Sequence, residues 1–283
     1  PEFLREGEAI RDFRFPDRIV IGSNNIRATN KMKSLYDPLI KKGAKFFSTS
    51  RRGAEIIKYA SNAFLATKIS YINEIANLCE KTGVNVEEVS IGIGLDQRIG
   101  SRFLRAGPAY GGSCFPKDTK AMTVTGDLFK INLSIIKSVI KSNNNRKKLL
   151  TKRVYEIMSN KLNKKIITFL GVTFKPNTDD MRESPCLTMI PKLLKSGAAI
   201  RYYDPTGKKK ELNKYKNVIF YNNSTNACSK SDLIIIHTEW NEFKTLDFNK
   251  IVKKNYFKIY DMRNLYSPEK MRKKKLNYFG IGR

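Results

Sequence analysis

The chain has 283 residues, 41% of them hydrophobic, which is long enough and apolar enough for two domains with separate cores. Lysine and arginine outnumber aspartate and glutamate by 54 to 26, giving a net charge of +28, but no zinc-finger, arginine-rich or RNP-type motif accompanies this charge, and we expect no nucleic-acid partner. The short clusters Lys208–Lys210 and Lys273–Lys275 are typical of solvated loops, and no apolar run is long enough to cross a bilayer, so we expect no membrane partner.

The first fifty residues predict a strand, a helix and a second strand. Ile19–Ile21 has the pattern of a buried strand, Asn30–Lys42 is amphipathic, and Lys45–Ser48 is a strand that follows Gly43. Three elements are too few to close a sheet. We interpret them as the end of a domain whose beginning is absent.

A largely helical region is predicted from about Ala54 to Asn145. Leu128–Met158 predicts one long helix that joins this region to the next, with Asn143–Asn145 as its weak point. The apolar positions that recur at spacings of three and four, and so predict a face turned to the core, are Ile56, Ile57, Ala60, Phe64, Ile69, Ile72, Ile75, Ala76 and Cys79.

After Leu162 strand and helix patterns alternate, which predicts a parallel sheet with helices on both faces. Ligands of such sheets bind at the carboxyl ends of the strands, where Gly171–Lys175 and Asp261–Arg263 fall. The predicted elements are the strands Lys165–Leu170, Ile200–Tyr203, Val218–Tyr221, Leu233–Ile236 and Phe257–Tyr260 and the helix Leu187–Lys195.

No complete dinucleotide-binding Gly-x-Gly-x-x-Gly pattern is present. Gly92–Gln97 begins with the right spacing, but it ends in Gln97 and follows a helix instead of a strand, so we expect it to be a loop. Gly171–Lys175 opens the C-terminal sheet without the glycine triplet.

The four cysteines lie far apart and include no Cys-x-x-Cys pair. With His237 as the one histidine, a zinc site is not expected and no metal is assigned. A disulfide framework does not fit a chain of this size either, so a cytoplasmic location fits best.

One of these cysteines has the surroundings of a nucleophile. In Gly112–Asp118 a glycine allows close approach to the backbone, Cys114 follows, and Pro116 suits the first turn of a helix. A cysteine at a helix N-terminus lies near unpaired N–H groups and the positive end of the helix dipole, which favour thiolate over thiol. The alternative is a small buried apolar residue. Lys117 and Asp118 add a cation and a group that handles protons.

The longer run Phe103–Asp118 closely resembles the catalytic segment of the UDP-glucose/GDP-mannose dehydrogenase family. The resemblance extends over essentially all 283 residues, in the family's order and approximate spacing. In this sequence Ala109 and Tyr110 stand where the family usually has glycine and phenylalanine. The other matching segments are Pro1–Gly7, Ile57–Asn62, Asp96–Gly100, Gly171–Lys175, Asp179–Ser184 and Asp261–Asn264.

The resemblance implies an α/β fold in three parts. Residues 1–48 would be the C-terminal remnant of a Rossmann domain that binds NAD, residues 49–160 a central helical dimerisation and catalytic domain, and residues 161–283 a Rossmann-like domain that binds a UDP-sugar. It also implies a homodimer through the central helices. The missing part of the NAD domain makes the chain a fragment, a truncated product or one half of a split enzyme with a separately encoded NAD-binding half.

The resemblance also implies the residues of the site. The catalytic residues would be Cys114, Lys58, Asn62, Asp118, Glu2 and Glu6. The residues at the substrate, UDP-glucose, would be Phe3, Leu4, Arg5, Lys58, Asn62, Arg98, Phe103, Leu104, Gly107, Tyr110, Gly111, Phe174, Lys175 and Arg263, with Arg98 reaching the site of a partner subunit. The residues at NAD would be Glu6, Cys114, Lys117 and Arg182.

Several of these residues have a simpler reading when taken singly. Lys58 on an amphipathic helix is usually a surface residue, Glu2 and Glu6 would usually be solvated, and Arg263 might only pair with Asp261.

The implied activity is the oxidation of UDP-glucose to UDP-glucuronate with two NAD⁺ through a cysteine thiohemiacetal and thioester. Two alternatives stay open. One is a catalytically inactive, truncated nucleotide-sugar-binding dimer, and the other is a related dehydrogenase acting on UDP-N-acetylmannosamine or GDP-mannose.

Overall fold

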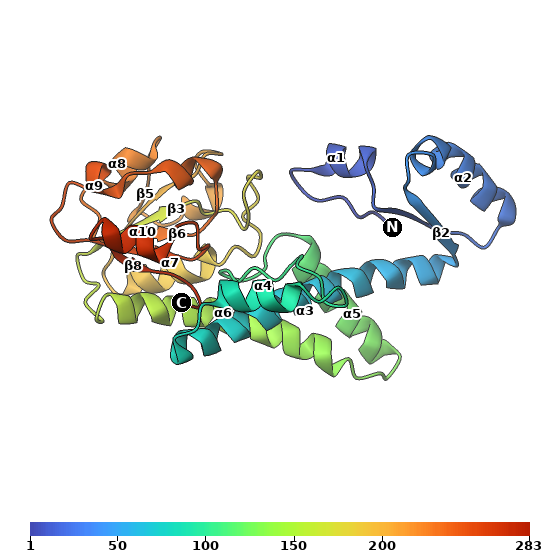
Figure 1. The fold of residues 1–283 in the computed structure, drawn as a ribbon, viewed down its shortest axis with the longest axis horizontal. Coiled ribbons are helices and arrows are strands. Elements are labelled where there is room, and N and C mark those ends of the chain that lie inside the picture. The colour runs from blue at the N-terminus through green and yellow to red at the C-terminus, as the bar shows by residue number, and fades with distance from the viewer. The chain divides into compact units, whose positions relative to one another are not determined.

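A computed structural model describes all residues from 1 to 283. The chain forms two compact units, residues 1–64 with 118–132 and residues 65–117 with 133–283. Two long helices, α3 (Arg51–Thr82) and α5 (Cys114–Leu128), contribute residues to both units (Figure 1). No helix is long and apolar enough to span a membrane.

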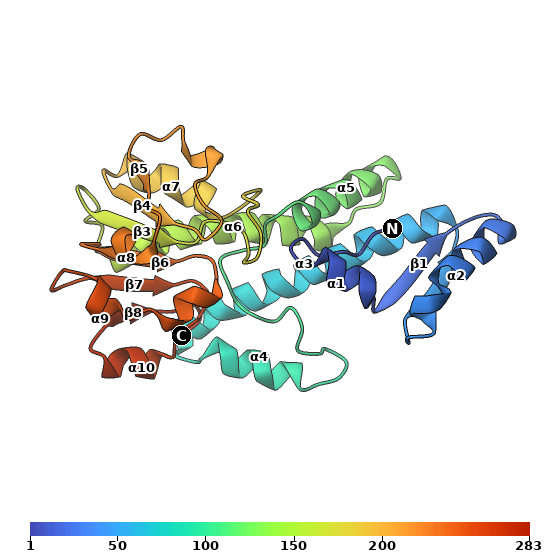
Figure 2. The same ribbon diagram turned by 90° about the horizontal axis from the view of Figure 1, so that it is seen from above.

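In the first unit the predicted strand, helix and strand are confirmed. β1 (Arg18–Gly22) and β2 (Lys45–Thr49) pair in parallel, and α2 (Ile26–Ile40) packs against both (Figure 2). α2 begins four residues earlier than predicted because the Asn25 side chain caps it, accepting hydrogen bonds from the next two free N–H groups of the helix. The short α1 (Ala9–Arg14) precedes β1.

The helical region is confirmed, but two predictions within it are wrong. Gly92 and Gly94 lie in α4 (Val86–Gly94), which Asn85 caps, and only the following residues form a turn. The connecting helix α6 runs from Ser134 to Ile157 and does not begin at Leu128, where α5 ends.

The predicted core face of α3 is only partly buried. Ile72, Ala76 and Cys79 are buried, whereas Ile56 and Phe64 are 59% and 65% exposed. Some apolar side chains in the predicted core face of α3 are therefore not covered by the core of this chain.

The second unit contains a six-stranded, all-parallel sheet, which confirms the predicted architecture and adds one strand, β8. The strand order β5-β4-β3-β6-β7-β8 is the 3-2-1-4-5-6 order of a Rossmann fold, with its reversal between β3 and β6. The strands are β3 (Ile166–Leu170), β4 (Ala199–Tyr203), β5 (Val218–Phe220), β6 (Leu233–Ile236), β7 (Lys258–Asp261) and β8 (Asn277–Phe279). The helices are α7 (Cys186–Lys195), α8 (Ser224–Cys228), α9 (Phe248–Ile251) and α10 (Pro268–Lys273), with short 3₁₀ turns at Lys210–Leu212 and Asn241–Thr245.

Alternating residues of the central strands supply two separate cores. Phe169 and Ile235 belong to a cluster with α6 and α7, and Leu170 and Ile234 belong to one with α8, α9 and α10. Both faces of the sheet are thus covered, as the apolar run of β6 requires. The first cluster also includes Ile72 of α3, so the later part of α3 and the sheet share one core.

Candidate active site

Cys114 is the first residue of α5 and its side chain is exposed, with Pro116 in the first turn as predicted. The other three cysteines are buried. Burial raises the pKa of Cys186 to about 12 and also raises the pKa of Cys228. Of the four thiols, only Cys114 combines solvent access with a helix N-terminus.

Asp118 follows Cys114 by one turn of α5 and is almost fully buried, at 1% exposure. Its Oδ2 accepts a 2.6 Å hydrogen bond from Nδ2 of Asn62 on α3. Lys58 lies one turn before Asn62 on α3, and its side chain is 16% exposed. The structure therefore brings Lys58, Asn62 and Asp118 together within the first unit.

The N-terminal segment contacts the same part of α3. Nζ of Lys58 lies 3.6 Å from Oε2 of Glu2 and 5.4 Å from the centre of the Phe3 ring. The guanidinium of Arg18 lies over the same ring at 4.2 Å. A carboxylate and two cations thus surround Phe3.

The other predicted residues of this segment are engaged differently. Leu4 donates its N–H to Glu2, and Arg5 forms a 2.6 Å ion pair with Asp12. That pair raises the pKa of Arg5, which makes it a fixed cation. Glu6 is exposed and begins a turn.

The predicted loop around the cysteine is buried from Ala106 to Gly112 and is held by polar side chains. Gly107 donates its N–H to Asn73 and accepts a hydrogen bond from Nε of Arg146 at 3.2 Å. Asn143 bonds both the N–H and the carbonyl of Tyr110, at 2.9 and 3.0 Å. Side chains of α3 and α6 therefore hold the loop by its backbone.

Residues at and just before this loop also pack against other parts of the second unit. Leu104 is buried, and its carbonyl accepts a 2.6 Å hydrogen bond from Ser90 of α4. Phe103 and Tyr110 both lie edge-on to Phe115, and their ring centres are 6.2 and 6.0 Å from that of Phe115. The unusual Tyr110 of this sequence is thus accommodated in a small apolar cluster.

Gly111 and Gly112 are required because the C-terminal domain lies directly against them. A Cβ on Gly111 would come within 2.8 Å of the Glu183 carbonyl oxygen, and a Cβ on Gly112 within 2.6 Å of the Phe174 ring. Gly112 also has φ = +76° and donates its N–H to the Arg182 carbonyl at 2.8 Å. The ring of the predicted substrate residue Phe174 therefore lies against Gly112, two residues before the cysteine.

Arg263 is used inside the protein. Its guanidinium forms a 2.7 Å ion pair with Glu239 and donates to the carbonyls of Phe174 and His237 at 2.8 and 2.9 Å. Asp261, the alternative partner, accepts a hydrogen bond from the backbone N–H of Arg263 and none from its guanidinium. Burial lowers the pKa of Arg263, and the Glu239 carboxylate offsets part of that shift.

Lys175 follows Phe174 and is half-buried. Its Nζ lies 5.6 Å from the Phe174 ring centre, and its carbonyl accepts a 3.0 Å hydrogen bond from Thr173. The two predicted substrate residues of this loop thus form one cation–aromatic pair.

Three predicted cationic residues are exposed. The Arg98 side chain is 89% exposed and pairs with Asp96, and that of Arg182 is 61% exposed and pairs with Asp180. Lys117, in the first turn of α5, is also exposed.

Several residues of the site were not predicted. Asn73 and Arg146 hold the loop backbone, the buried Lys147 forms a 2.7 Å ion pair with the exposed Glu183, and Glu239 neutralises Arg263. The run Asn143–Asn145, which was expected to weaken α6, lies inside an unbroken helix. It was the one sequence feature that pointed to these residues, because Asn143 is buried and holds the loop at Tyr110.

The chain is thus an α/β protein with a sheet of Rossmann strand order, and a loop of that sheet closely approaches an exposed cysteine at the start of a helix. The UDP-glucose/GDP-mannose dehydrogenase family has models that match the chain in three places: its NAD binding domain at residues 1–40, its central domain at residues 52–145 and its UDP binding domain at residues 168–268. The chain belongs to this family.

Individual relatives agree. The chain is 45% identical over 288 residues to the UDP-glucose 6-dehydrogenase of Rickettsia prowazekii and 44% identical over 288 residues to that of Rhizobium meliloti. Its structure matches that of a UDP-glucose dehydrogenase from Pyrobaculum islandicum with a TM-score of 0.88 at 35% identity, covering all of this chain and 62% of that one. The two alignments with the curated relatives cover all of this chain but only 66% and 65% of the relatives' own lengths.

Proposed function

We propose that the protein to which this chain belongs oxidises UDP-glucose to UDP-glucuronate, with Cys114 as the nucleophile. The observation that carries the proposal is the exposed thiol at the first residue of α5, beside a loop fixed by Gly111 and Gly112. The curated relatives named UDP-glucose 6-dehydrogenase, at 39–45% identity over the whole chain, support it.

The chemistry explains why a thiol is needed. NAD⁺ would supply a hydride acceptor for each of two oxidations. Loss of a hydride and a proton from the sugar's primary alcohol gives an aldehyde, and the Cys114 thiolate adds to its carbon to give a thiohemiacetal that stays bound to the protein. Loss of the second hydride and the hydroxyl proton leaves a thioester. Water then attacks the carbonyl, and the C–S bond breaks to release the carboxylate and the thiolate.

Lys58, Asn62 and Asp118 are proposed to act on the oxygen atoms of these intermediates. Anionic tetrahedral species need donors fixed in advance, which an ammonium and an amide one turn apart on α3 can supply. Asp118 is proposed to position a water that carries protons, and Glu2 or Glu6 to help activate the hydrolytic water. The hydrogen bond from Asn62 and the ion pair of Glu2 with Lys58 support these roles.

The UDP-sugar is proposed to bind at the carboxyl edge of the six-stranded sheet. Phe174 and Lys175 lie on the loop after β3, beside the reversal in strand order where such sheets bind ligands. Arg263 carries its positive charge to the same edge. Phe103, Leu104, Gly107, Tyr110 and Gly111 would wrap the ligand, and Phe3, Leu4 and Arg5 would meet the sugar.

The same proposal includes a homodimer through the central helices. Tyr71 and Leu78, seven residues apart on α3, are 51% and 59% exposed, which favours a helix partner along that face. Arg98, exposed and outside the predicted sites of its own chain, would then reach the site of the partner subunit.

NAD⁺ is the proposed cofactor. Arg182 and Lys117 are exposed cations in the two segments beside Gly112, and cations of that kind fit a pyrophosphate. Glu6 and Cys114 would lie at the nicotinamide. A separately encoded NAD-binding half and the division into residues 1–48, 49–160 and 161–283 remain part of this proposal.

The free state of all four thiols supports a cytoplasmic location.

Titration calorimetry with UDP-glucose and NAD⁺ in separate runs tests the proposal. We expect UDP-glucose to bind, and the Cys114→Ser variant to bind it equally well while losing all turnover in the assembled enzyme. Binding of UDP-glucose without any NAD⁺ binding or turnover would contradict the dehydrogenase activity and favour the nucleotide-sugar-binding dimer. A preference for UDP-N-acetylmannosamine or GDP-mannose would point to a related dehydrogenase. Full activity of Cys114→Ser would exclude the covalent route.

A further inference from the structure

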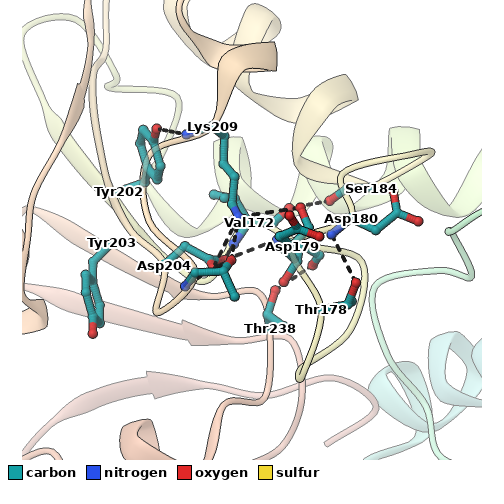
Figure 3. Close-up of polar contacts among 12 residues, drawn as sticks. Val172, Thr178, Asp179, Asp180, Ser184, Tyr202, Tyr203, Asp204, Lys209 and Thr238 are labelled. Carbon is teal, nitrogen blue, oxygen red and sulfur yellow. Dashed lines mark hydrogen bonds and ion pairs between the residues drawn. The ribbon is translucent and has the colours of Figure 1, made fainter. Parts of the chain in front are cut away.

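Lys209 contradicts the prediction of a solvated lysine cluster. Its side chain is 4% exposed, whereas the neighbouring Lys208 and Lys210 are exposed. The ammonium lies 3.8 Å from Oδ1 of Asp204, whose side chain is fully buried, and it donates to Thr206 (Figure 3). A buried ion pair of this kind needs a structural reason, because removing both charges from water is costly.

Asp204 uses its two oxygens for different purposes. Oδ1 accepts hydrogen bonds from the N–H and the hydroxyl of Thr206, at 3.0 and 2.5 Å. Oδ2 accepts from the backbone N–H groups of Val172 and Thr173, at 2.9 and 3.4 Å. The first oxygen is held by its own turn, and the second holds the segment that follows β3.

This arrangement differs from a dinucleotide-binding sheet. There, N–H groups after the first strand bind a phosphate, and an acidic residue after the second strand binds a ribose. Here Asp204, directly after β4, accepts the N–H groups of the residues that follow Gly171 after β3. An internal carboxylate has taken the place of the bound anion, so this backbone is fixed before any ligand arrives.

The carbonyl groups of the same two residues are fixed as well. Ser184 donates to the Val172 carbonyl and Thr238 to the Thr173 carbonyl, both at 2.6 Å (Figure 3). Phe174 comes next, and its ring lies against Gly112, two residues before the cysteine. The contacts therefore run without a gap from the buried carboxylate to the segment that carries the nucleophile.

We propose that Asp204, neutralised by Lys209, is a positioning residue that sets the place of Phe174 and Lys175 and, through Gly112, the start of α5. The inference rests on the proposed function, in which Phe174 and Lys175 contact the UDP-sugar. Neither Asp204 nor Lys209 touches the ligand itself.

Three variants test it. Asp204→Asn keeps the shape, but its amide nitrogen must face either the N–H groups of Val172 and Thr173 or the N–H and hydroxyl of Thr206, and an amide nitrogen cannot accept from a backbone N–H on either side. The double variant Asp204→Asn with Lys209→Met removes both charges, so it avoids an isolated buried ammonium. Lys208→Met, an exposed neighbour, is the matched control for the lysine change.

Two measurements are made on each folded variant, UDP-glucose affinity by calorimetry and amide hydrogen exchange of the segment after β3. We expect both Asp204 variants to bind UDP-glucose roughly 10- to 100-fold more weakly and the Val172 and Thr173 amides to exchange at least about tenfold faster, since a charged hydrogen-bond network is lost. Lys208→Met should change neither. A residue that served stability alone would lower the melting temperature and leave the affinity of the folded double variant unchanged.

The double variant decides the outcome. Wild-type affinity and wild-type exchange in that variant would overturn the inference. If the unaltered chain fails to bind UDP-glucose, the proposed function fails separately. The exchange of the two amides, together with the alkylation rate of Cys114, then tests the positioning role alone, and an unchanged result in both would reject it.

Discussion

Asn62 and Asp118 lie 56 residues apart in the chain, and their buried side chains share a 2.6 Å hydrogen bond between Nδ2 and Oδ2. The bond joins α3 to α5, and each helix carries a second predicted catalytic residue one turn away, Lys58 on α3 and Cys114 on α5. This hydrogen bond thus connects the two helices on which the proposed chemistry depends.

Asn62→Ala should destabilise the protein by about 1–3 kcal/mol, because it removes a donor from a buried carboxylate. Urea unfolding measures the change. The matched control is Asn144→Ala on α6, where the asparagine is exposed and the same substitution should have little effect. Equal effects of the two substitutions would show that the buried bond contributes nothing.

Gly112→Ala should be more damaging than Gly100→Ala. Both glycines have positive φ, +76° and +67°, so both substitutions introduce backbone strain of about 1 kcal/mol. A Cβ on Gly100 meets nothing within 4 Å, whereas one on Gly112 would lie 2.6 Å from the Phe174 ring. Thermal unfolding and UDP-glucose titration should therefore show an additional loss only at residue 112. The contrary result is an equal loss at both positions.

Stability should fall between pH 7.5 and pH 5 because of His237. Burial, followed by the nearby Arg263 charge, lowers the pKa of this side chain from 6.5 to about 3. Below pH 6.5 the unfolded chain binds a proton that the folded chain does not, so acid favours unfolding, by about 2 kcal/mol at pH 5. The loss ends only where the pH falls through the folded-state value.

Two measurements check this pH dependence. Urea unfolding across the pH range should show the slope in the native protein, and the slope should disappear in His237→Gln. As the one histidine of the chain, His237 also gives a single imidazole signal by nuclear magnetic resonance. A native signal that titrates near pH 6 would contradict the prediction.

Glu239→Gln should cost about 3–5 kcal/mol, because it leaves the Arg263 guanidinium buried without its counter-ion. Asp96→Asn, which breaks the ion pair of the exposed Arg98, should leave stability unchanged. Chemical denaturation of the two variants side by side gives the comparison. A small effect at Glu239 would show that the backbone carbonyls alone hold Arg263.

Local patterns were sufficient for much of the fold. The strands around Ile19, Leu233 and Ile200 were predicted because apolar runs between turn residues need no distant partner to be recognised. The start of α6 was misplaced because Leu128 and Ser134 fit the same periodicity, and only the structure shows the turn between them. Gly92 and Gly94 were assigned to a loop because the Gly92–Gln97 pattern ends in Gln97 and follows a helix instead of a strand. The Asn85 cap and the packing of α4 keep both glycines helical, although glycine is a weak helix former.

The sequence by itself predicted the segment around Cys114, the parallel sheet and the family, because the patterns that indicate them lie in residues close together in the chain. Only the tertiary structure decided which charged side chains are buried in ion pairs and which stay exposed to solvent. Arg263 meets Glu239 and Lys147 meets Glu183 across the fold, whereas Lys209 pairs with Asp204 of its own turn, which the surrounding structure buries. No local pattern distinguishes a buried lysine from its two exposed neighbours, because burial is a property of the whole packed core.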